Sequence, residues 1–317
     1  MVAVSQKHIS LKQRQSLPLE AKVQMSIARI RQWYDHWEGL VYVSFSGGKD
    51  STVLLHIVRS VYPEVPAVFA DTGLEYPEIR DFVKTIDNVV WVRPKMKFPD
   101  VLAKYGYPAV SKRIAQYVND VRRSTERGAQ TRRLRLTGMK SDGTFSQMSM
   151  IPKKWQYLIH APFAISDKCC NAMKKQPMDT YQKSTGRYPY VGTMASEGNQ
   201  RTQTYFRYGC NAYGIKRPRS APMSFWTEPD IWQYLREHGL PYSSIYDMGY
   251  KRTGCMFCMF GAHLEPEPNR FQLMAQTHPR QYRYCMESLG CGKVLDHIGA
   301  PCRPQRSLFD TNPAQLN

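Results

Sequence analysis

The 317-residue sequence predicts an α/β fold built on a parallel β-sheet. Short runs rich in β-branched and aromatic residues alternate with amphipathic helical stretches, which is the pattern of βαβ units. A glycine-rich polar loop follows the first of these runs, and polar segments also follow residues 70 and 193. Because functional loops of such sheets lie at the carboxyl ends of the strands, we expect these segments to form one site.

The elements follow one another in a regular order along the chain. Residues 1–37 are expected to form a helical lead-in, with an apolar stripe at Val23, Ile27, Ile30 and Tyr34. Helices are predicted directly after the glycine-rich loop and near Pro77–Lys84. Strands are predicted over residues 39–46, 65–71, 89–94 and 188–194.

The charge balance indicates a polyanionic partner. Lys and Arg number 44 and Asp and Glu 26, so the formal net charge is +18. Such a chain attracts nucleic acid, an anionic membrane surface or a phosphate-rich ligand. The stretch 112–135 alone holds eight basic and two acidic residues, which fits either a nucleic-acid contact or a solvated basic helix. Without a long apolar run or a signal-like N-terminus, we expect a cytoplasmic protein with no membrane span.

The segment SFSGGKDS, residues 44–51, has the composition of a phosphate-binding loop. Its two glycines let backbone amides approach an anion, its lysine adds positive charge, and the helix that follows directs its N-terminal amides to the same place. The loop is not a Walker A motif, because Tyr42 stands where that motif needs glycine. The alternative is a Gly-Gly turn with a polar helix cap. The residues expected to bind nucleotide are Ser44, Ser46, Gly47, Gly48, Lys49, Asp50 and Ser51.

Four of the eight cysteines form a pattern typical of a metal site. Cys169 and Cys170 are adjacent in SDKCCNAMKKQP, and Cys255 and Cys258 form a CxxC in RTGCMFC. In a reducing compartment such thiols bind iron–sulfur clusters or zinc, and four complete either site. The pattern alone does not decide between these metals or exclude unrelated buried thiols.

Together, these motifs resemble the phosphoadenosine-phosphosulfate-reductase-like family of the adenine-nucleotide α-hydrolase superfamily. The resemblance runs from about residue 40 to 260 and includes GYPAVSK (106–112) and GTMASEGNQR (192–201). It implies a Rossmann-like parallel sheet with helices on both faces, ATP with Mg²⁺, and a [4Fe–4S] cluster on the four cysteines. It also implies that Asp71 and Thr72 lie near the nucleotide, with Glu197 beside it, and that Lys49, Asp50 and Arg201 are catalytic. The implied division is a lead-in (1–37), a nucleotide-binding domain with cluster ligands (38–260) and a Cys-rich C-terminal extension (261–317).

Two departures suggest which branch of the family the chain resembles. The reductases usually carry an altered phosphate loop, whereas SGGKDS is intact. They also attack sulfur with a cysteine in a Glu-Cys-Gly-(Leu/Ile)-His motif, whereas LGCGKVLDH around Cys291 lacks that histidine. The chain therefore resembles the ATP pyrophosphatase of DNA phosphorothioation systems, which implies nucleic acid, most readily DNA, as acceptor and a cysteine desulfurase or another sulfur donor as partner. The alternatives are a sulfonucleotide reductase that forms sulfite and a non-catalytic nucleotide- and cluster-binding module. The roles of Cys210, Cys285, Cys291 and Cys302 stay open.

Overall fold

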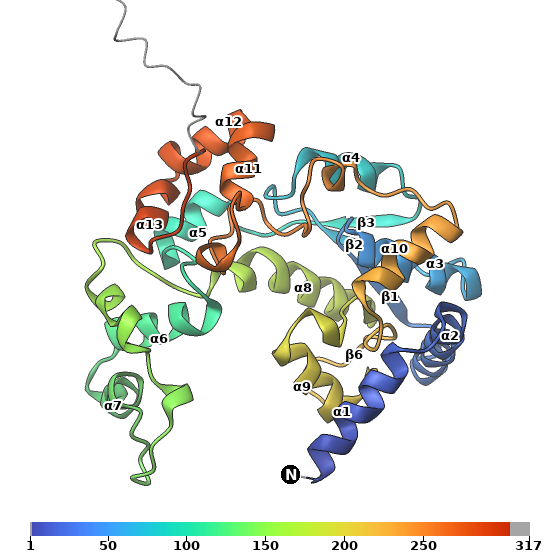
Figure 1. The fold of residues 1–317 in the computed structure, drawn as a ribbon, viewed down its shortest axis with the longest axis horizontal. Helices are drawn as coiled ribbons and strands as arrows, with labels where there is room; N and C mark the ends of the chain where they lie inside the picture. The colour runs from blue at the N-terminus through green and yellow to red at the C-terminus, as the bar shows by residue number, and fades with distance from the viewer. Residues whose placement is uncertain (1, 305–317) are drawn as a thin grey trace, which may run out of the picture. The chain divides into compact units, whose positions relative to one another are not determined.

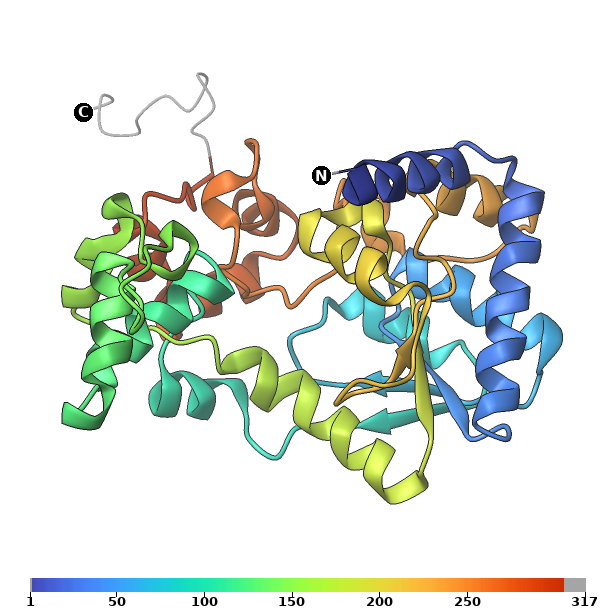
Figure 2. The same ribbon diagram turned by 90° about the horizontal axis from the view of Figure 1, so that it is seen from below.

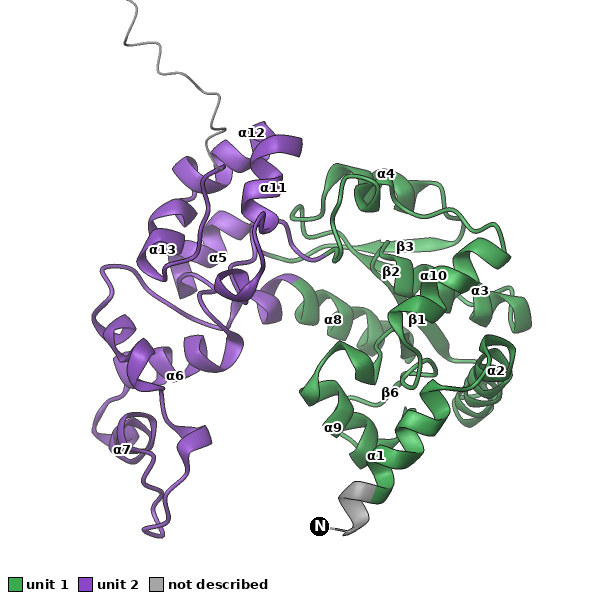
Figure 3. Cartoon of the chain, in the orientation of Figure 1, with its two compact units in different colours: residues 1–95, 174–253 green, residues 96–173, 254–317 purple. Residues whose placement is uncertain are grey.

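The structure is a computed structural model, and it describes residues 2–304, with side chains from residue 6 onward. The chain forms two compact units, and each is built from two separate stretches (Figure 3). Unit 1 contains residues 1–95 and 174–253, and unit 2 contains residues 96–173 and 254–317. The division at residues 37 and 260 expected from the sequence stays a prediction. No described helix has the length and apolar character that a membrane crossing requires.

Unit 1 is organised around a six-stranded sheet in the order β3-β2-β1-β4-β6-β5 (Figure 1). Every neighbouring pair is parallel except β5 and β6, so the predicted parallel α/β fold is confirmed. The chain runs from β1 outward to β2 and β3, and then returns to place β4 on the other side of β1. The carboxyl ends of β1 and β4 therefore form the switch point at which ligands of such sheets bind. The strands are β1 Val41–Phe45, β2 Ala67–Ala70, β3 Val89–Val92, β4 Tyr188–Val191, β5 Asn211–Ala212 and β6 Arg219–Ser220.

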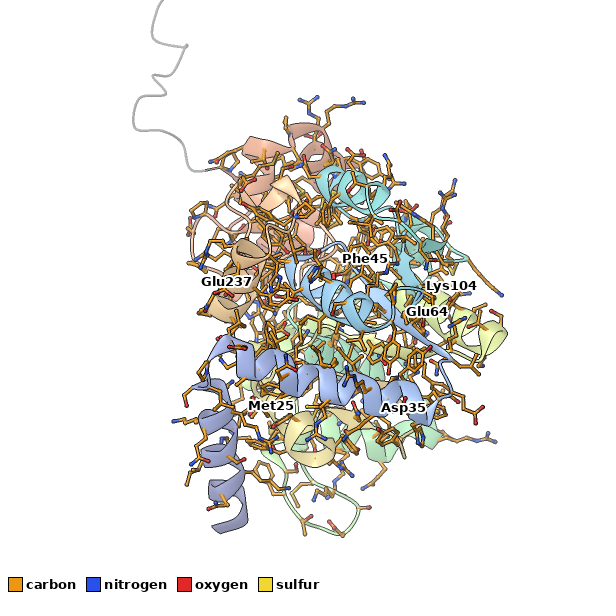
Figure 4. All side chains as sticks on the ribbon, turned by 90° about the vertical axis from the view of Figure 1, so that its right-hand side faces the viewer. Met25, Asp35, Phe45, Glu64, Lys104 and Glu237 are labelled. Atoms are coloured by element: carbon orange, nitrogen blue, oxygen red, sulfur yellow. The ribbon has the colours of Figure 1, made fainter. Side chains whose placement is uncertain are left out.

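Helices cover both faces of this sheet, as expected. Successive side chains of β1 point to opposite faces. Phe45, which is labelled in Figure 4, is buried and packs near Phe82 of α4 (Pro77–Lys84). Tyr42 points the other way and meets Tyr181 of α8 (Gln176–Thr185). The other helices of unit 1 are α1 Val2–Gln15, α2 Leu19–His36, α3 Lys49–Val61, α9 Asn199–Tyr208 and α10 Glu228–Glu237.

The N-terminal lead-in is helical, as predicted, but the buried face of α2 differs from the expected stripe. The buried residues are Leu19, Lys22, Ser26, Ile30 and Trp33, whereas Val23, Ile27 and Tyr34 are half-buried. Two polar residues turn the helix this way. The Lys22 amine lies 2.8 Å from both carboxylate oxygens of Asp230, and Ser26 accepts a hydrogen bond from the Trp226 indole. The spacing of apolar residues could not predict this buried face. The polar side chains that turn it inward bind residues about 200 positions later in the chain.

The first helix packs on α9, as Figures 1 and 2 show. Arg14 donates a hydrogen bond of 2.6 Å to the Tyr205 hydroxyl, and the ring of His8 meets that of Phe206 edge-on. These contacts give Tyr205 and Phe206 a structural role.

Unit 2 is helical, and its segments are joined by loops and short 3₁₀ turns. Single π-helical turns lie over Asn171–Lys175, at the border with unit 1, and over Tyr284–Ser288. Its helices are α5 Phe98–Tyr105, α6 Lys112–Arg123, α7 Ala129–Thr137, α11 Arg270–Thr277, α12 Pro279–Arg283 and α13 Cys291–His297.

Candidate active site

The predicted phosphate loop forms a tight turn between β1 and α3. Gly47 has φ 71°, and a Cβ there would lie 2.8 Å from Cγ2 of both Ile79 and Val83 of α4. Only glycine fits this conformation and this approach. Ser51 is buried in the first turn of α3, where its hydroxyl donates to the Gly48 carbonyl at 2.8 Å and accepts from the Ser46 amide at 3.2 Å. These two hydrogen bonds tie the loop to the first turn of α3.

Residues 243–253 lie against this loop. A Cβ on Gly48 would lie 2.6 Å from the Thr253 hydroxyl and 3.2 Å from the Tyr246 hydroxyl. The Lys49 amide donates a 2.9 Å hydrogen bond to the Tyr246 hydroxyl. The Tyr246 hydroxyl thus occupies one of the helix N-terminal amides that would otherwise bind an anion.

The Lys49 side chain is buried in a pocket of aromatic and acidic groups. Its amine lies 3.1 Å from a Glu228 carboxylate oxygen, 5.8 Å from the centre of the Trp232 ring and 5.2 Å from that of Tyr246. Burial opposes the charge of Lys49, but Asp50, Tyr246 and Glu228 together raise its pKa. Lys49 is therefore charged. The sequence around Lys49 gives no sign that Glu228, Trp232 and Tyr246 surround its amine.

Asp50 connects the loops that follow β1 and β4. Burial, together with the nearby Glu197 and Glu228, raises its pKa to about 6 against the opposing effects of Lys49 and Arg201. A Cβ at Gly192, which follows β4, would lie 3.1 Å from the Asp50 carbonyl oxygen. Glu197 forms an ion pair with Arg201, one turn along in α9. The expected meeting of the two loops is therefore present, and Asp50, Glu197 and Arg201 share one charge network.

Two further networks fix the loop after β2. The buried carboxylate of Asp71 lies 3.1 Å from Arg80 and 3.3 Å from Arg93. The adjacent Thr72 bonds through its amide, at 2.9 Å, and its hydroxyl, at 2.8 Å, to the buried carboxylate of Glu75.

Glu75 also faces a lysine that follows the adjacent cysteine pair in the sequence. The amine of Lys174 lies 3.6 Å from its carboxylate. Sequence reasoning placed Asp71 and Thr72 here, but Arg80, Arg93 and Glu75 could only be identified from the fold.

All four cysteines of the predicted cluster site lie in unit 2, although they are far apart in sequence. Tyr107 forms a parallel bridge with Ile165, a few residues before Cys169, and Val110 forms one with Phe260, just after Cys258. The stretch 107–110 thus has one cysteine segment on each side. The stretch within GYPAVSK is thus bridged to both segments that carry the predicted ligands.

The close pairing depends on Gly106. This residue has φ 97°, and a Cβ would lie only 2.4 Å from the carbonyl carbon and oxygen of Ala164. Such a distance is sterically forbidden, so any side chain would force the two stretches apart. The amide of Tyr107 donates to Ala164 at 2.8 Å and that of Ser166 to Tyr107 at 3.0 Å.

The donor set matches an iron–sulfur cluster in its chemistry. The four residues carry thiols that are not joined in disulfides, and thiolates are the usual ligands of such clusters. Within the CxxC turn, the Cys258 amide donates to the Cys255 carbonyl at 3.0 Å. Among residues 2–304, no group of three or more His, Cys, Asp or Glu side chains is arranged around a metal position. The four-cysteine site and its metal therefore stay a prediction.

The three C-terminal cysteines are buried in unit 2. The thiols of Cys285 and Cys291 are hydrogen-bonded to each other, and this contact and burial raise the pKa of Cys285. Cys302 lies 3.5 Å from a carboxylate oxygen of Asp296, and burial together with this carboxylate raises its pKa to about 11. Cys285 and Cys302 are thus protonated at neutral pH, and thiols, unlike thiolates, are poor nucleophiles.

Comparison with known proteins identifies the family of the chain. The family model of the phosphoadenosine phosphosulfate reductase domain matches residues 40–260, more than half of the chain. An adenosine 5'-phosphosulfate reductase of Staphylococcus epidermidis is 24% identical over 231 residues, which are 72% of this chain and 74% of the relative.

Two solved structures also match. A phosphoadenylyl-sulfate reductase from Candida auris has a TM-score of 0.43 at 15% identity, over 76% of this chain and 96% of that one. A U34-tRNA thiolase from Methanococcus maripaludis with its [4Fe–4S] cluster has a TM-score of 0.36 at 15% identity, over 93% of this chain and 86% of that one. On the extent of the family match, the chain belongs to the phosphoadenosine phosphosulfate reductase family.

Proposed function

We propose that this protein is an ATP pyrophosphatase that activates a phosphate of nucleic acid, most readily DNA, for replacement of oxygen by sulfur. The observation that carries the proposal is the intact phosphate loop at the β1–β4 switch point. Gly47, Gly48 and the N-terminus of α3 form an anion cradle there, and the charged amine of Lys49 is buried beside it. This arrangement suits a β,γ-pyrophosphate.

The reaction proceeds in two balanced displacements. A non-bridging oxygen of the nucleic-acid phosphate attacks the α-phosphorus of ATP, the bond between the α-phosphorus and the bridging oxygen breaks, and pyrophosphate leaves. A hydrosulfide-level sulfur then attacks the activated phosphorus, a P–S bond forms, and AMP leaves. The proton of the hydrosulfide is released, and no atom changes its oxidation state. Adenylation is needed because it converts a phosphate oxygen into a good leaving group.

The chain's own residues have separate roles in these displacements. Lys49 neutralises the pyrophosphate as its charge develops, and Asp50 binds the Mg²⁺ that accompanies ATP. Arg201, which Glu197 orients, holds the α-phosphate. Cys169, Cys170, Cys255 and Cys258 would hold the [4Fe–4S] cluster, which would supply iron to which sulfur can bind. A cysteine desulfurase or another donor would provide that sulfur.

The test is an anaerobic assay of AMP and pyrophosphate formed from ATP with sulfide as the sulfur source, with and without DNA, followed by mass spectrometry of the digested DNA for phosphorothioate linkages. We expect pyrophosphate release that depends on DNA and is lost in Lys49→Ala. Lys84→Ala is the matched control, because its exposed amine contacts only Asp81 on α4. A wild-type protein that forms no AMP under these conditions would refute the proposal.

The second candidate is a sulfonucleotide reductase, favoured by the similarity to the reductase of Staphylococcus epidermidis. Cys291, the counterpart of the reductase nucleophile, is poorly placed to attack a substrate. This residue is completely buried, and its thiol contacts Cys285. Sulfite release from adenylyl sulfate with a thiol reductant, without ATP turnover, would establish this second candidate instead. Binding of ATP without turnover of either substrate would indicate a non-catalytic module.

A further inference from the structure

Residues 112–154 of unit 2 form a strongly basic surface feature, which we call the basic arm. It consists of α6, α7 and a turn over residues 138–146 that is closed by an antiparallel bridge between Met139 and Phe145 (Figure 1). The arm contains eleven Lys and Arg but only three Asp and Glu. It therefore accounts for eight of the eighteen excess positive charges of the chain.

Two of the arginines hold the arm together. Arg135 lies 3.1 Å from Asp120, donates to the Ser149 carbonyl and stacks 3.7 Å above the centre of the Tyr117 ring. Arg122 donates to the carbonyls of Phe163 and Ala161, at 2.6 and 3.2 Å. These two arginines are structural, so the binding role that the sequence suggested for the whole stretch 112–135 does not extend to them.

The other cations of the arm are exposed, and none of them pairs with a carboxylate of the described residues. Holding so many like charges together costs free energy, which a polyanion would recover. A cluster of exposed, unpaired cations on one part of the surface is the usual footprint of a phosphodiester backbone. The exposed cations are Lys112, Arg113, Arg123, Arg127, Arg132, Arg133, Lys140, Lys153 and Lys154.

The same arm exposes two large apolar side chains. Phe145 is 61% exposed and Met148 is 73% exposed. One edge of the Phe145 ring lies against Gly138, where a Cβ would be 2.6 Å from Cε2 of the ring. An exposed aromatic ring among unpaired cations is the combination on which bases of single strands stack.

We propose that the basic arm binds a strand of DNA, with its unpaired arginines on the phosphates and Phe145 stacked on an unpaired base. This inference rests on the proposed function, because it assigns the surface that binds the acceptor. A membrane surface is also anionic, but the arm does not suit it. The apolar face of α6, with Ile114, Val118 and Val121, is buried, so the arm has no continuous apolar face to insert.

The test measures binding of a fluorescein-labelled single-stranded DNA oligonucleotide by anisotropy over a range of salt concentrations. In the triple variant Arg127→Gln, Arg132→Gln, Arg133→Gln, we expect weaker binding and a salt slope reduced by about 2. The matched control is Arg280→Gln, Arg283→Gln, Lys293→Gln, which removes three exposed cations from α12 and α13 of the same unit. Equal effects of the two triple variants, or unchanged binding in the first, would overturn the proposal.

Two single variants refine the test. Phe145→Ala should weaken binding of the single strand about tenfold and that of a duplex much less, because only an unpaired base can stack on the ring. Arg135→Gln should lower the melting temperature, whereas the triple variant should melt like the wild type. Tighter binding of RNA than of DNA of the same sequence would overturn the assignment to DNA.

The two proposals can fail separately. Lys49→Ala should bind DNA normally while it forms no pyrophosphate. If the arm variants bind DNA normally and wild-type ATP turnover is intact, only the arm assignment is wrong. If the arm binds DNA but ATP is not cleaved, the proposed reaction is wrong and the binding surface stands.

Discussion

The backbone amide of Lys49 donates a 2.9 Å hydrogen bond to the side-chain hydroxyl of Tyr246, nearly 200 residues later in the chain. This amide belongs to the first turn of α3, where a phosphate oxygen would bind, so the hydroxyl and the phosphate compete for it. We expect Tyr246→Phe to bind pyrophosphate about 3- to 10-fold more tightly, the equivalent of one hydrogen bond. Isothermal titration calorimetry measures this affinity.

Tyr242→Phe is the control for that change, since the hydroxyl of Tyr242 bonds to Asp247 at 3.2 Å and not to the phosphate loop. It should leave the affinity for pyrophosphate unchanged. Weaker binding by Tyr246→Phe would mean that the hydroxyl donates to the phosphate rather than competing with it.

Asp50 should make the protein less stable as the pH rises. Its pKa is about 6 in the folded protein and 3.8 in its ordinary state, so the folded form binds the proton more tightly. The stability this provides is complete below about pH 4 and is lost as the pH rises through 6. We expect Asp50→Asn to raise the free energy of unfolding by about 1–2 kcal/mol at pH 7.5 and by little at pH 4. Urea unfolding at the two pH values measures the difference.

Asp142 provides a control of opposite sign. Hydrogen bonds from the hydroxyl and amide of Thr144 lower its pKa, so its charged form is the favoured one. Asp142→Asn should therefore lose stability at pH 7.5, not gain it. A stabilisation by Asp50→Asn that is equal at both pH values would disprove the explanation from burial of its charge.

The buried pair of Lys22 and Asp230 should make a large contribution to the stability of unit 1. The Lys22 side chain is only 2% exposed, and its removal would leave the Asp230 charge without its cation. We expect Lys22→Met to cost about 3 kcal/mol in chemical denaturation. Lys84→Met breaks an exposed pair with Asp81, at 2.6 Å, and should cost less than about 1 kcal/mol. Similar costs for the two variants would contradict this ranking.

Gly106 should be essential for the pairing that aligns the cysteine segments. Gly106→Ala must push apart the stretches that now approach each other at Ala164, and we expect a cost of about 2–4 kcal/mol from strain and lost packing. Gly209 also has a positive φ, of 68°, but a Cβ there would meet nothing within 4 Å. Gly209→Ala therefore measures only the free-energy cost of a positive φ in a residue with a side chain. Equal losses of melting temperature in the two variants would exclude the steric explanation for Gly106.

The predicted cluster ligands can be distinguished from the other cysteines by iron analysis. In protein purified without oxygen, Cys170→Ser or Cys258→Ser should lose most of the iron, acid-labile sulfide and visible absorbance of the wild type. Cys302→Ser, which alters a buried thiol next to Asp296, should keep them. Colourless wild-type protein with one equivalent of zinc would replace the cluster with a zinc site.

Local patterns were sufficient to predict most of the sheet. The runs that became β1, β2, β3 and β4 are rich in Val, Tyr, Phe and Trp, and each ends near the predicted residue. The two-residue strands β5 and β6 were missed, because they are too short to have a period of their own. The phosphate loop could be predicted because phosphate binding requires a specific run of adjacent residues.

The partners of that loop could not be found in the same way. Glu228 and Trp232 reach Lys49 only because α10 packs on α3, and this contact leaves no trace in the spacing of either helix. Arg135 resembled its neighbours Arg132 and Arg133 in sequence, yet Asp120 and Tyr117 make it part of the interior. Side chains of one type thus have different roles, and the fold decides which role each one has.

The stretch 107–110, with one cysteine segment on each side, also limits when the site can form during synthesis. Cys255 follows Cys170 by 85 residues, nearly all of which belong to unit 1. At about 5–20 residues per second, a ribosome needs about 4–17 seconds to reach the second pair. During that time Cys169 and Cys170 have no CxxC partner. The predicted site therefore cannot form before all of unit 1 has been synthesised.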